Sequence, residues 1–168
     1  MFIAYTIAIF LADRFKGIFG AEVFRVALVA GIASGLVEIL TIAGENNAIA
    51  LSVPAPLGLL SVFAIWGAAG IWAMLALRSM RAGVSASVVS AGVCMLIGVA
   101  GGVLIEMFVA PTKPAVVATW QEFRRSGWTN PEAFQIANTL DSAFGHLLFA
   151  PIVGLVVGTI GAGLCRLL

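Results

Sequence analysis

Four long apolar stretches make up most of this chain and restrict its fold more than any other feature. They cover residues 23–43, 57–77, 84–109 and 143–164, and each is long enough to cross a bilayer as a helix, which takes about 20 residues. The chain is 61% hydrophobic and 10% charged, whereas a soluble domain carries about 25% charged residues. We therefore predict one all-α membrane domain over residues 1–168, a four-transmembrane-helix bundle in contact with the lipid bilayer.

The N-terminal segment is apolar but does not look like a further span. Residues 1–12 are too few to cross a bilayer core of about 30 Å at about 1.5 Å per residue. Charged residues follow this run instead of preceding it, which is unlike a secretory signal peptide. We interpret residues 1–19 as an interfacial or partly inserted helix, with a fifth span as the alternative.

The connection between the third and fourth spans is predicted to contain an amphipathic helix. Val116, Trp120 and Phe123 recur at i, i+4 and i+7, and charged residues occupy the other face. Gly127 is expected to end this helix. The helix is suited to lying on the membrane surface, with tryptophan at headgroup depth. Alternatively, the same helix packs as a cap over the bundle.

A second peripheral helix is predicted just before the fourth span. Thr129 with Glu132 makes a capping box, or Asn130 caps the helix with Pro131 at its first position. From either start the helix is expected to run into the fourth span. Pro151 lies inside that span and should kink it or loosen one backbone hydrogen bond.

Basic residues predict the orientation of the spans. They lie in the N-terminal flank, between the second and third spans and at the C-terminus: Arg14, Lys16, Arg25, Arg78, Arg81 and Arg166. Cytoplasmic segments carry an excess of lysine and arginine. We therefore expect a multi-pass protein of the bacterial inner (plasma) membrane with both termini in the cytoplasm. The connection between the third and fourth spans would then lie outside, where longer segments tolerate its basic residues.

Small residues recur at every fourth position in three of the spans. Lipid does not drive helices together by the hydrophobic effect, so helices associate where small side chains allow their backbones to approach closely. These stripes therefore predict helix contacts, either inside one chain or between copies. The glycines of these stripes are Gly31, Gly35, Gly98, Gly102, Gly154 and Gly158.

Four ionisable residues are predicted to lie at one level near the outer ends of the spans. Glu38 and Glu106 stand inside apolar stretches, and Asp141 and His146 stand at the start of the fourth span. Charged groups within membrane spans are costly and usually face an interior or a wet cavity. This cluster could therefore carry protons, bind a cation or hold a metal. Alternatively, it is a rim near the headgroups that hydrogen-bonds internally or pairs with Lys113, Arg124 or Arg125 of the overlying connection.

The chain shows no pattern typical of an enzyme. The spacings of metalloproteases, serine hydrolases, P-loops and dinucleotide-binding folds are all missing, and a net charge of +1 does not favour nucleic acid as a partner. We expect a non-enzymatic protein without cofactor or metal, acting by helix association as a homo-oligomer or as an accessory subunit of a membrane assembly. The alternative is a small proton- or cation-coupled transporter or channel using Glu38 and Glu106. A third option is a metal or pigment held by His146, the only histidine, which can supply at most one ligand per chain.

The layout resembles one family of small bacterial inner-membrane proteins, the domain of unknown function family number 4199. The shared features are four spans, a basic connection after the second span, and a helical, acid-containing connection before a glycine-rich last span. In this chain the matching stretch covers residues 111–164, with residues 127–133 and 154–163 carrying most of the resemblance. The N-terminal segment departs from that layout. The resemblance implies a four-span fold and no particular activity, cofactor or site residue.

Overall fold

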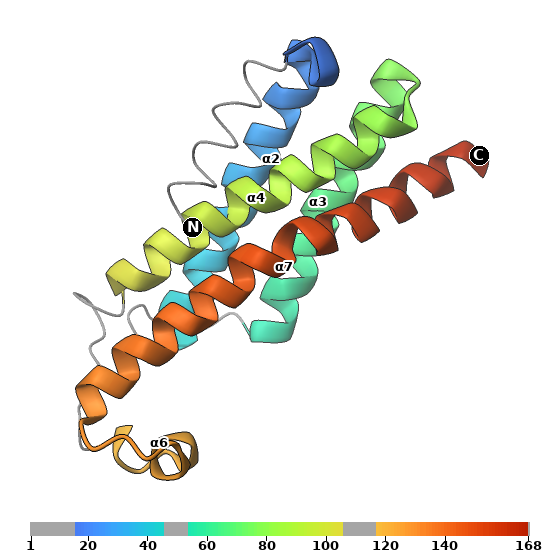
Figure 1. Ribbon diagram of the computed structural model, residues 1–168. Coiled ribbons are helices and arrows are strands. Elements are labelled where there is room, and N and C mark those ends of the chain that lie inside the picture. Colours follow the sequence, from blue (N-terminus) through green and yellow to red (C-terminus); the bar gives the residue numbers. More distant parts are fainter. Residues whose placement is uncertain (1–15, 46–53, 106–116, 168) are drawn as a thin grey trace.

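The chain folds into helices that run side by side. The computed structural model describes residues 16–45, 54–105 and 117–167, and the regular structure within these ranges is helical. The all-α class predicted from the sequence is confirmed. The helices are α2 (Lys16–Glu45), α3 (Ala55–Leu77), α4 (Met80–Leu104), α6 (Gln121–Ser126) and α7 (Pro131–Leu167) (Figure 1). Residues 1–15 of the predicted N-terminal helix, and Glu106, lie outside the described residues.

Four of these helices have the length and the composition of membrane spans. They cover Gly20–Gly44, Ala55–Leu77, Met80–Leu104 and Pro131–Cys165. In α2 the span begins at a kink, because Gly20 has φ 64° and ψ 144°. Glycine has no Cβ and adopts this conformation without steric cost. Residues 16–19 are therefore set apart from the membrane helix that follows.

A very short connection joins α3 to α4. Arg78 ends α3 in the left-handed conformation, with φ 49°. Ser79 then caps α4, because its Oγ accepts a hydrogen bond of 3.4 Å from the backbone N–H of Ala82. This connection turns the chain back on itself. As a result, α4 begins at Met80, before the predicted start of the third span at residue 84.

The fourth span and the helix predicted before it form one continuous helix, α7. Of the two predicted starts, the structure has the cap by Asn130, whose Oδ1 accepts hydrogen bonds from the N–H groups of Glu132 (2.9 Å) and Ala133 (3.2 Å). Pro151 lies inside α7 without ending it. The 37 residues of α7 are about 55 Å long at about 1.5 Å per residue, longer than a hydrocarbon core of about 30 Å. Its first turns reach past the other spans towards α6 (Figure 1).

The amphipathic helix predicted around Trp120 is shorter than expected. Trp120 precedes α6 in an extended conformation, with φ −64° and ψ 138°, so it is not on a helical face shared with Phe123. Gly127 ends α6 with φ 77°, as predicted. Phe123 of α6 and Trp128 of the connection that follows pack against the start of α7: their ring centroids lie 5.4 Å and 6.2 Å from that of Phe134.

The helix α4 occupies the centre of the bundle. It packs against α2, α3 and α7, and α3 also packs against α2 and α7. Figure 1 shows α4 between α2 and α7. The glycines of the stripes lie at these contacts within one chain. A Cβ built on Gly35 would lie 2.8 Å from Ile97 Cβ, and one built on Gly158 would lie 2.8 Å from Ser87 Cβ. The α2–α4 and α4–α7 pairs are therefore in close backbone contact.

Buried hydrogen bonds also link the spans. The indole Nε1–H of Trp66 on α3 donates to Ser34 Oγ on α2 over 3.1 Å. On α4, Ser87 Oγ donates to the backbone oxygen of Trp66 (2.8 Å), and Ser90 Oγ donates to that of Ala27 on α2 (3.1 Å). Hydrogen bonds of this kind stabilise membrane bundles because hydrocarbon offers no alternative partner. Together they fix α2, α3 and α4 relative to one another.

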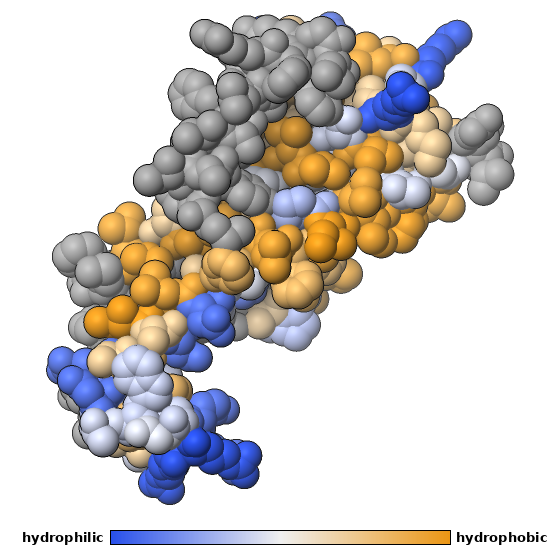
Figure 2. Space-filling view, in the orientation of Figure 1, coloured by the Kyte–Doolittle hydropathy of each residue, from blue (hydrophilic) through white to orange (hydrophobic). Residues whose placement is uncertain are grey.

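The outer surface of the bundle is apolar. Val29 on α2, Leu60 on α3 and Phe149 on α7 are 63%, 65% and 61% exposed. Figure 2 shows hydrophobic residues over the middle of the bundle and hydrophilic residues gathered at its two ends. An exposed apolar surface of this extent is unstable in water and suits hydrocarbon. The structure thus supports a multi-pass membrane protein.

Candidate functional site

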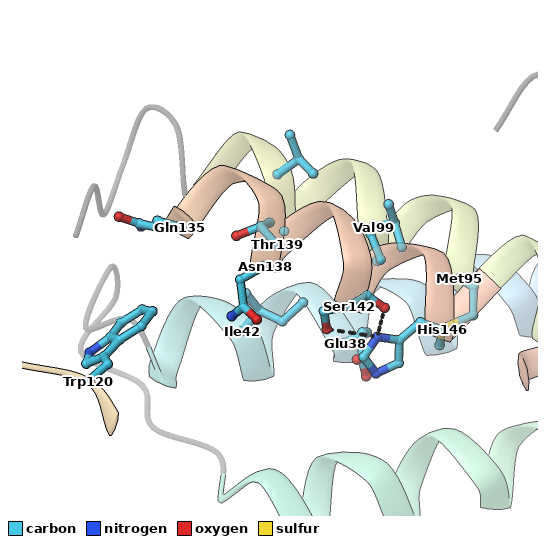
Figure 3. A pocket seen from close by; sticks show the side chains of 14 residues that line it. Glu38, Ile42, Met95, Val99, Trp120, Gln135, Asn138, Thr139, Ser142 and His146 are labelled. Atoms are coloured by element: carbon cyan, nitrogen blue, oxygen red, sulfur yellow. Dashed lines mark hydrogen bonds between the residues drawn. The ribbon is translucent and has the colours of Figure 1, made fainter. Parts of the chain in front are cut away.

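A pocket of about 460 Å³ lies between α2, α4 and α7, near the end of the bundle that carries α6 (Figure 3). Its α4 side is formed by small and apolar residues, among them Met95, Gly98 and Val99. Trp120, just before α6, closes part of its outer end. The charged and hydrogen-bonding groups come from α2 and α7. The pocket therefore has one apolar wall and one polar wall.

The polar wall belongs to a single face of α7. Gln135, Asn138, Thr139, Ser142 and His146 all line the pocket. They stand at i, i+3, i+4, i+7 and i+11, which places them along one side of a helix. Figure 3 shows these side chains along the α7 ribbon. The helix α7 thus turns a polar stripe towards the pocket, where Asn138, Ser142 and His146 remain exposed.

Glu38 brings the carboxylate of α2 to this pocket. Its side chain is partly buried and lies against Gly98, where a Cβ would come within 2.8 Å of Glu38 Cγ. A glycine at this point of α4 therefore leaves room for the Glu38 side chain. Glu38 stands six residues before Gly44, the end of the first span, which is about 9 Å along the helix axis. The carboxylate is therefore inside the span, not at its end.

A second hollow, of about 380 Å³, lies between α2 and α3 on the other side of Glu38. It is lined by Thr41 and Ile42 of α2 and by the first turns of α3, including Ala55 and Leu59. Glu38 and Ile42 line both hollows. The hydroxyl of Thr41 donates to the backbone oxygen of Val37 over 2.9 Å. This cleft is accordingly more apolar than the pocket beside α7.

His146 is oriented by its own helix. Its Nδ1 lies 2.8 Å from the backbone oxygen of Ser142 and 3.5 Å from Ser142 Oγ (Figure 3). A carbonyl oxygen only accepts hydrogen bonds, so the shorter contact requires a proton on Nδ1. In the neutral ring Nε2 is then the acceptor. The imidazole can therefore accept a hydrogen bond through Nε2.

The structure brings two of the four predicted cluster residues to one pocket. Glu38 and His146 both line it, from opposite helices. Asp141 is exposed on α7 and does not line it, because it falls outside the polar stripe of that helix. Glu106 lies outside the described residues. Of the basic residues considered as partners, Arg124 donates from Nε to the backbone oxygen of Ala118 over 3.4 Å.

Most of the polar wall was not predicted from the sequence. The predicted cluster contained ionisable residues alone, so it omitted Gln135, Asn138, Thr139 and Ser142. The signal was present: these four residues share a helical period with His146. Trp120 was expected on an amphipathic helix, whereas it lines the pocket. Neutral polar residues at helical spacing are therefore the pattern that identifies the α7 stripe.

The chemistry of the pocket is that of a polar binding site. One carboxylate supplies negative charge, and amides, hydroxyls and an imidazole supply hydrogen-bond donors and acceptors. In the ranges that the structure describes, histidine, cysteine and acidic side chains form no group of three or more that could hold a metal ion. Such a pocket can bind a proton, water or a small polar cation. Comparison with protein-family models, curated proteins and solved structures found no match for this chain, and its resemblance to the four-span family stays a prediction.

Proposed function

We propose that the protein is a small membrane transporter or channel for a proton or another small cation, with Glu38 as the charged group of its pocket. The observation that carries this proposal is the meeting of Glu38 with the polar stripe of α7 at one pocket of the bundle. Glu38 lies about 9 Å from the end of its span, and a charged side chain within a membrane helix carries a cost that reaches about 2.5–3.5 kcal/mol at the helix centre. A bound cation offsets part of this cost, and a protein that needed only stability would use an apolar residue at this position.

The size of the pocket also supports this function. A volume of about 460 Å³ holds on the order of 15 water molecules at about 30 Å³ each. Polar groups on α7 can hydrogen-bond that water. Filled with water, a pocket of this size would suit a cation with its solvent or a small organic cation. It also lets a proton reach Glu38 along a chain of waters.

Currents from reconstituted protein test the proposal. Proteoliposomes on a solid support are exposed to jumps in pH, Na⁺ or tetramethylammonium, and the charge movement is recorded. We expect the wild-type protein to give a current with at least one of these cations and Glu38→Gln to lose it. Asp141→Asn is the matched control, because it removes a carboxylate from the same end of the bundle without altering the pocket. Equal currents from wild type and Glu38→Gln would refute the role of Glu38.

We also propose that the protein lies in the bacterial inner membrane with both termini on the cytoplasmic side. The α6 end of the bundle then faces outward. Arg78 and Arg81 support this orientation, because they lie at the connection between α3 and α4. In intact cells, an impermeant maleimide should then label Ser126→Cys at the end of α6 and leave Arg81→Cys unlabelled. The reverse labelling would contradict the orientation.

Association with a second copy or with another membrane subunit stays a prediction. It was based on the glycine stripes, the short loops and the absence of catalytic patterns, and the stripes pack between helices of the same chain. The stripes therefore give no separate reason to expect a partner. Chemical cross-linking in the native membrane, followed by sizing in mild detergent, tests this hypothesis independently of transport.

A further inference from the structure

Glu38 lies between two hollows of opposite character. The pocket beside α7 is lined by amides, hydroxyls and an imidazole. The cleft between α2 and α3 is lined mainly by apolar side chains, among them Ile42, Pro56 and Leu59. Because Glu38 lines both, a molecule whose charge is held at this carboxylate has a polar space on one side of it and an apolar space on the other.

The apolar cleft adjoins the lipid-facing surface of α3. Leu59 lines the cleft and is 51% exposed, and its neighbours Leu57 and Leu60 are 56% and 65% exposed. Apolar side chains exposed to this extent on a membrane span are suited to contact with hydrocarbon. An apolar group in the cleft therefore lies beside the membrane interior. The polar pocket, in contrast, extends along α7 towards Trp120 and the end of the bundle.

We propose that the preferred ligand is an amphipathic organic cation. Its ammonium group lies against Glu38 and its alkyl tail occupies the cleft between α2 and α3. This inference rests on the proposed cation-handling role of Glu38 and adds the chemical class of the cation. The carboxylate selects positive charge, while burial of apolar surface favours each methylene that enters the cleft. A bare inorganic cation would use only the polar pocket.

Binding of two quaternary ammonium ions separates the contributions of head and tail. Tetramethylammonium carries the head alone, and butyltrimethylammonium adds three methylenes to one arm. Each buried methylene tightens binding about threefold to fourfold, since it contributes about 0.8 kcal/mol. With all three methylenes buried, we therefore expect butyltrimethylammonium to bind about thirtyfold to sixtyfold more tightly. Isothermal titration of protein in nanodiscs measures both affinities, and empty nanodiscs correct for partitioning into lipid.

Two tryptophan variants on α3 locate the tail. Leu59→Trp adds bulk at the cleft and should remove most of the advantage of butyltrimethylammonium while leaving tetramethylammonium binding unchanged. Leu60→Trp makes the same change on the adjacent, lipid-facing residue and should preserve the advantage. Both residues are more than half exposed, so neither substitution disturbs the packed core.

The outcomes distinguish this inference from the proposed function. Glu38-dependent binding of both ions with equal affinity, or an advantage that survives Leu59→Trp, overturns the amphipathic ligand and leaves cation handling intact. Failure of both ions to bind in a Glu38-dependent way also overturns it, and the current recordings then decide the proposed function separately. The comparison of the two ions on the wild-type protein suffices even if Leu59→Trp fails to fold.

Discussion

Adding one methyl group to Gly154 should destabilise the bundle. Gly154 lies where α7 crosses α4. A Cβ at this position would lie 2.8 Å from Ala91 Cβ, 3.0 Å from the backbone oxygen of Ser87 and 3.1 Å from Val88 Cα. These are backbone atoms or the first atom of a side chain, and none of them can rotate away. Gly154→Ala must therefore push α7 and α4 apart, with loss of the packing that holds them.

The magnitude follows from two opposing terms. Overpacking of a well-packed contact costs about 1–3 kcal/mol. Replacing glycine by alanine within a helix stabilises the helix by up to about 1 kcal/mol, which offsets part of the cost of overpacking. At Gly145 on the same helix, no atom of the described residues lies within 4 Å of the position that a Cβ would take. Gly145→Ala therefore gains the helix stabilisation without the cost of overpacking. The helix term cancels when the two variants are compared, and we expect Gly154→Ala to be less stable than Gly145→Ala by about 1–3 kcal/mol.

Equilibrium unfolding measures this difference. Purified variants in mixed micelles are titrated with sodium dodecyl sulfate, and helix content is followed by circular dichroism. The expected order of stability is Gly145→Ala at or above wild type, with Gly154→Ala below both. Equal stability of the two variants would refute the reasoning, because it would mean that α4 and α7 do not approach as closely as the structure indicates.

Three further predictions concern the pocket and the core. Gly98→Ala should displace the Glu38 side chain, since the new Cβ would lie 2.8 Å from Glu38 Cγ, and weaken tetramethylammonium binding about tenfold; unchanged affinity would contradict the contact. Trp66→Phe removes the hydrogen bond to Ser34 Oγ and part of a fully buried ring, and it should cost at least about 1 kcal/mol in the same unfolding assay; wild-type stability would contradict both contributions. Ser142→Cys, in a background without other cysteines, should react with a water-soluble maleimide in nanodiscs, because the pocket admits water; a lack of reaction would show a dry pocket.

The positions of the spans along the chain followed from local features of the sequence. Apolar runs and their ends identified the four long helices, because in lipid every backbone polar group must be satisfied within its own segment. Gly127 and Asn130 were recognised as the end of one helix and the start of the next, since both act through their own backbone or side chain. The position of Trp120 was predicted wrongly. Its extended conformation ends the helical period that Val116 and Phe123 indicated.

The candidate site was only partly predictable. Glu38 and His146 stood out as ionisable residues in apolar surroundings, and both line the pocket. Asp141 is also ionisable but lies off the polar stripe of α7. Whether a residue of α7 lines the pocket depends on how that helix is rotated within the bundle, which the sequence does not give. No pattern in the sequence predicted the cleft beside Leu59. The cleft lies between α2 and α3, next to Glu38, and therefore depends on how these two helices pack.

The amino-acid sequence was sufficient for the class of the protein and for the set of helices, because burial in lipid and helix capping act on neighbouring residues. The tertiary structure decided which helices touch and what each polar residue faces. The glycine stripes illustrate the division: their spacing predicted close contacts, but their partners, within the chain, depended on how four helices fit together. Glu38 is the second example, since its place between a polar pocket and an apolar cleft comes from residues on α3, α4 and α7 that are distant in the chain.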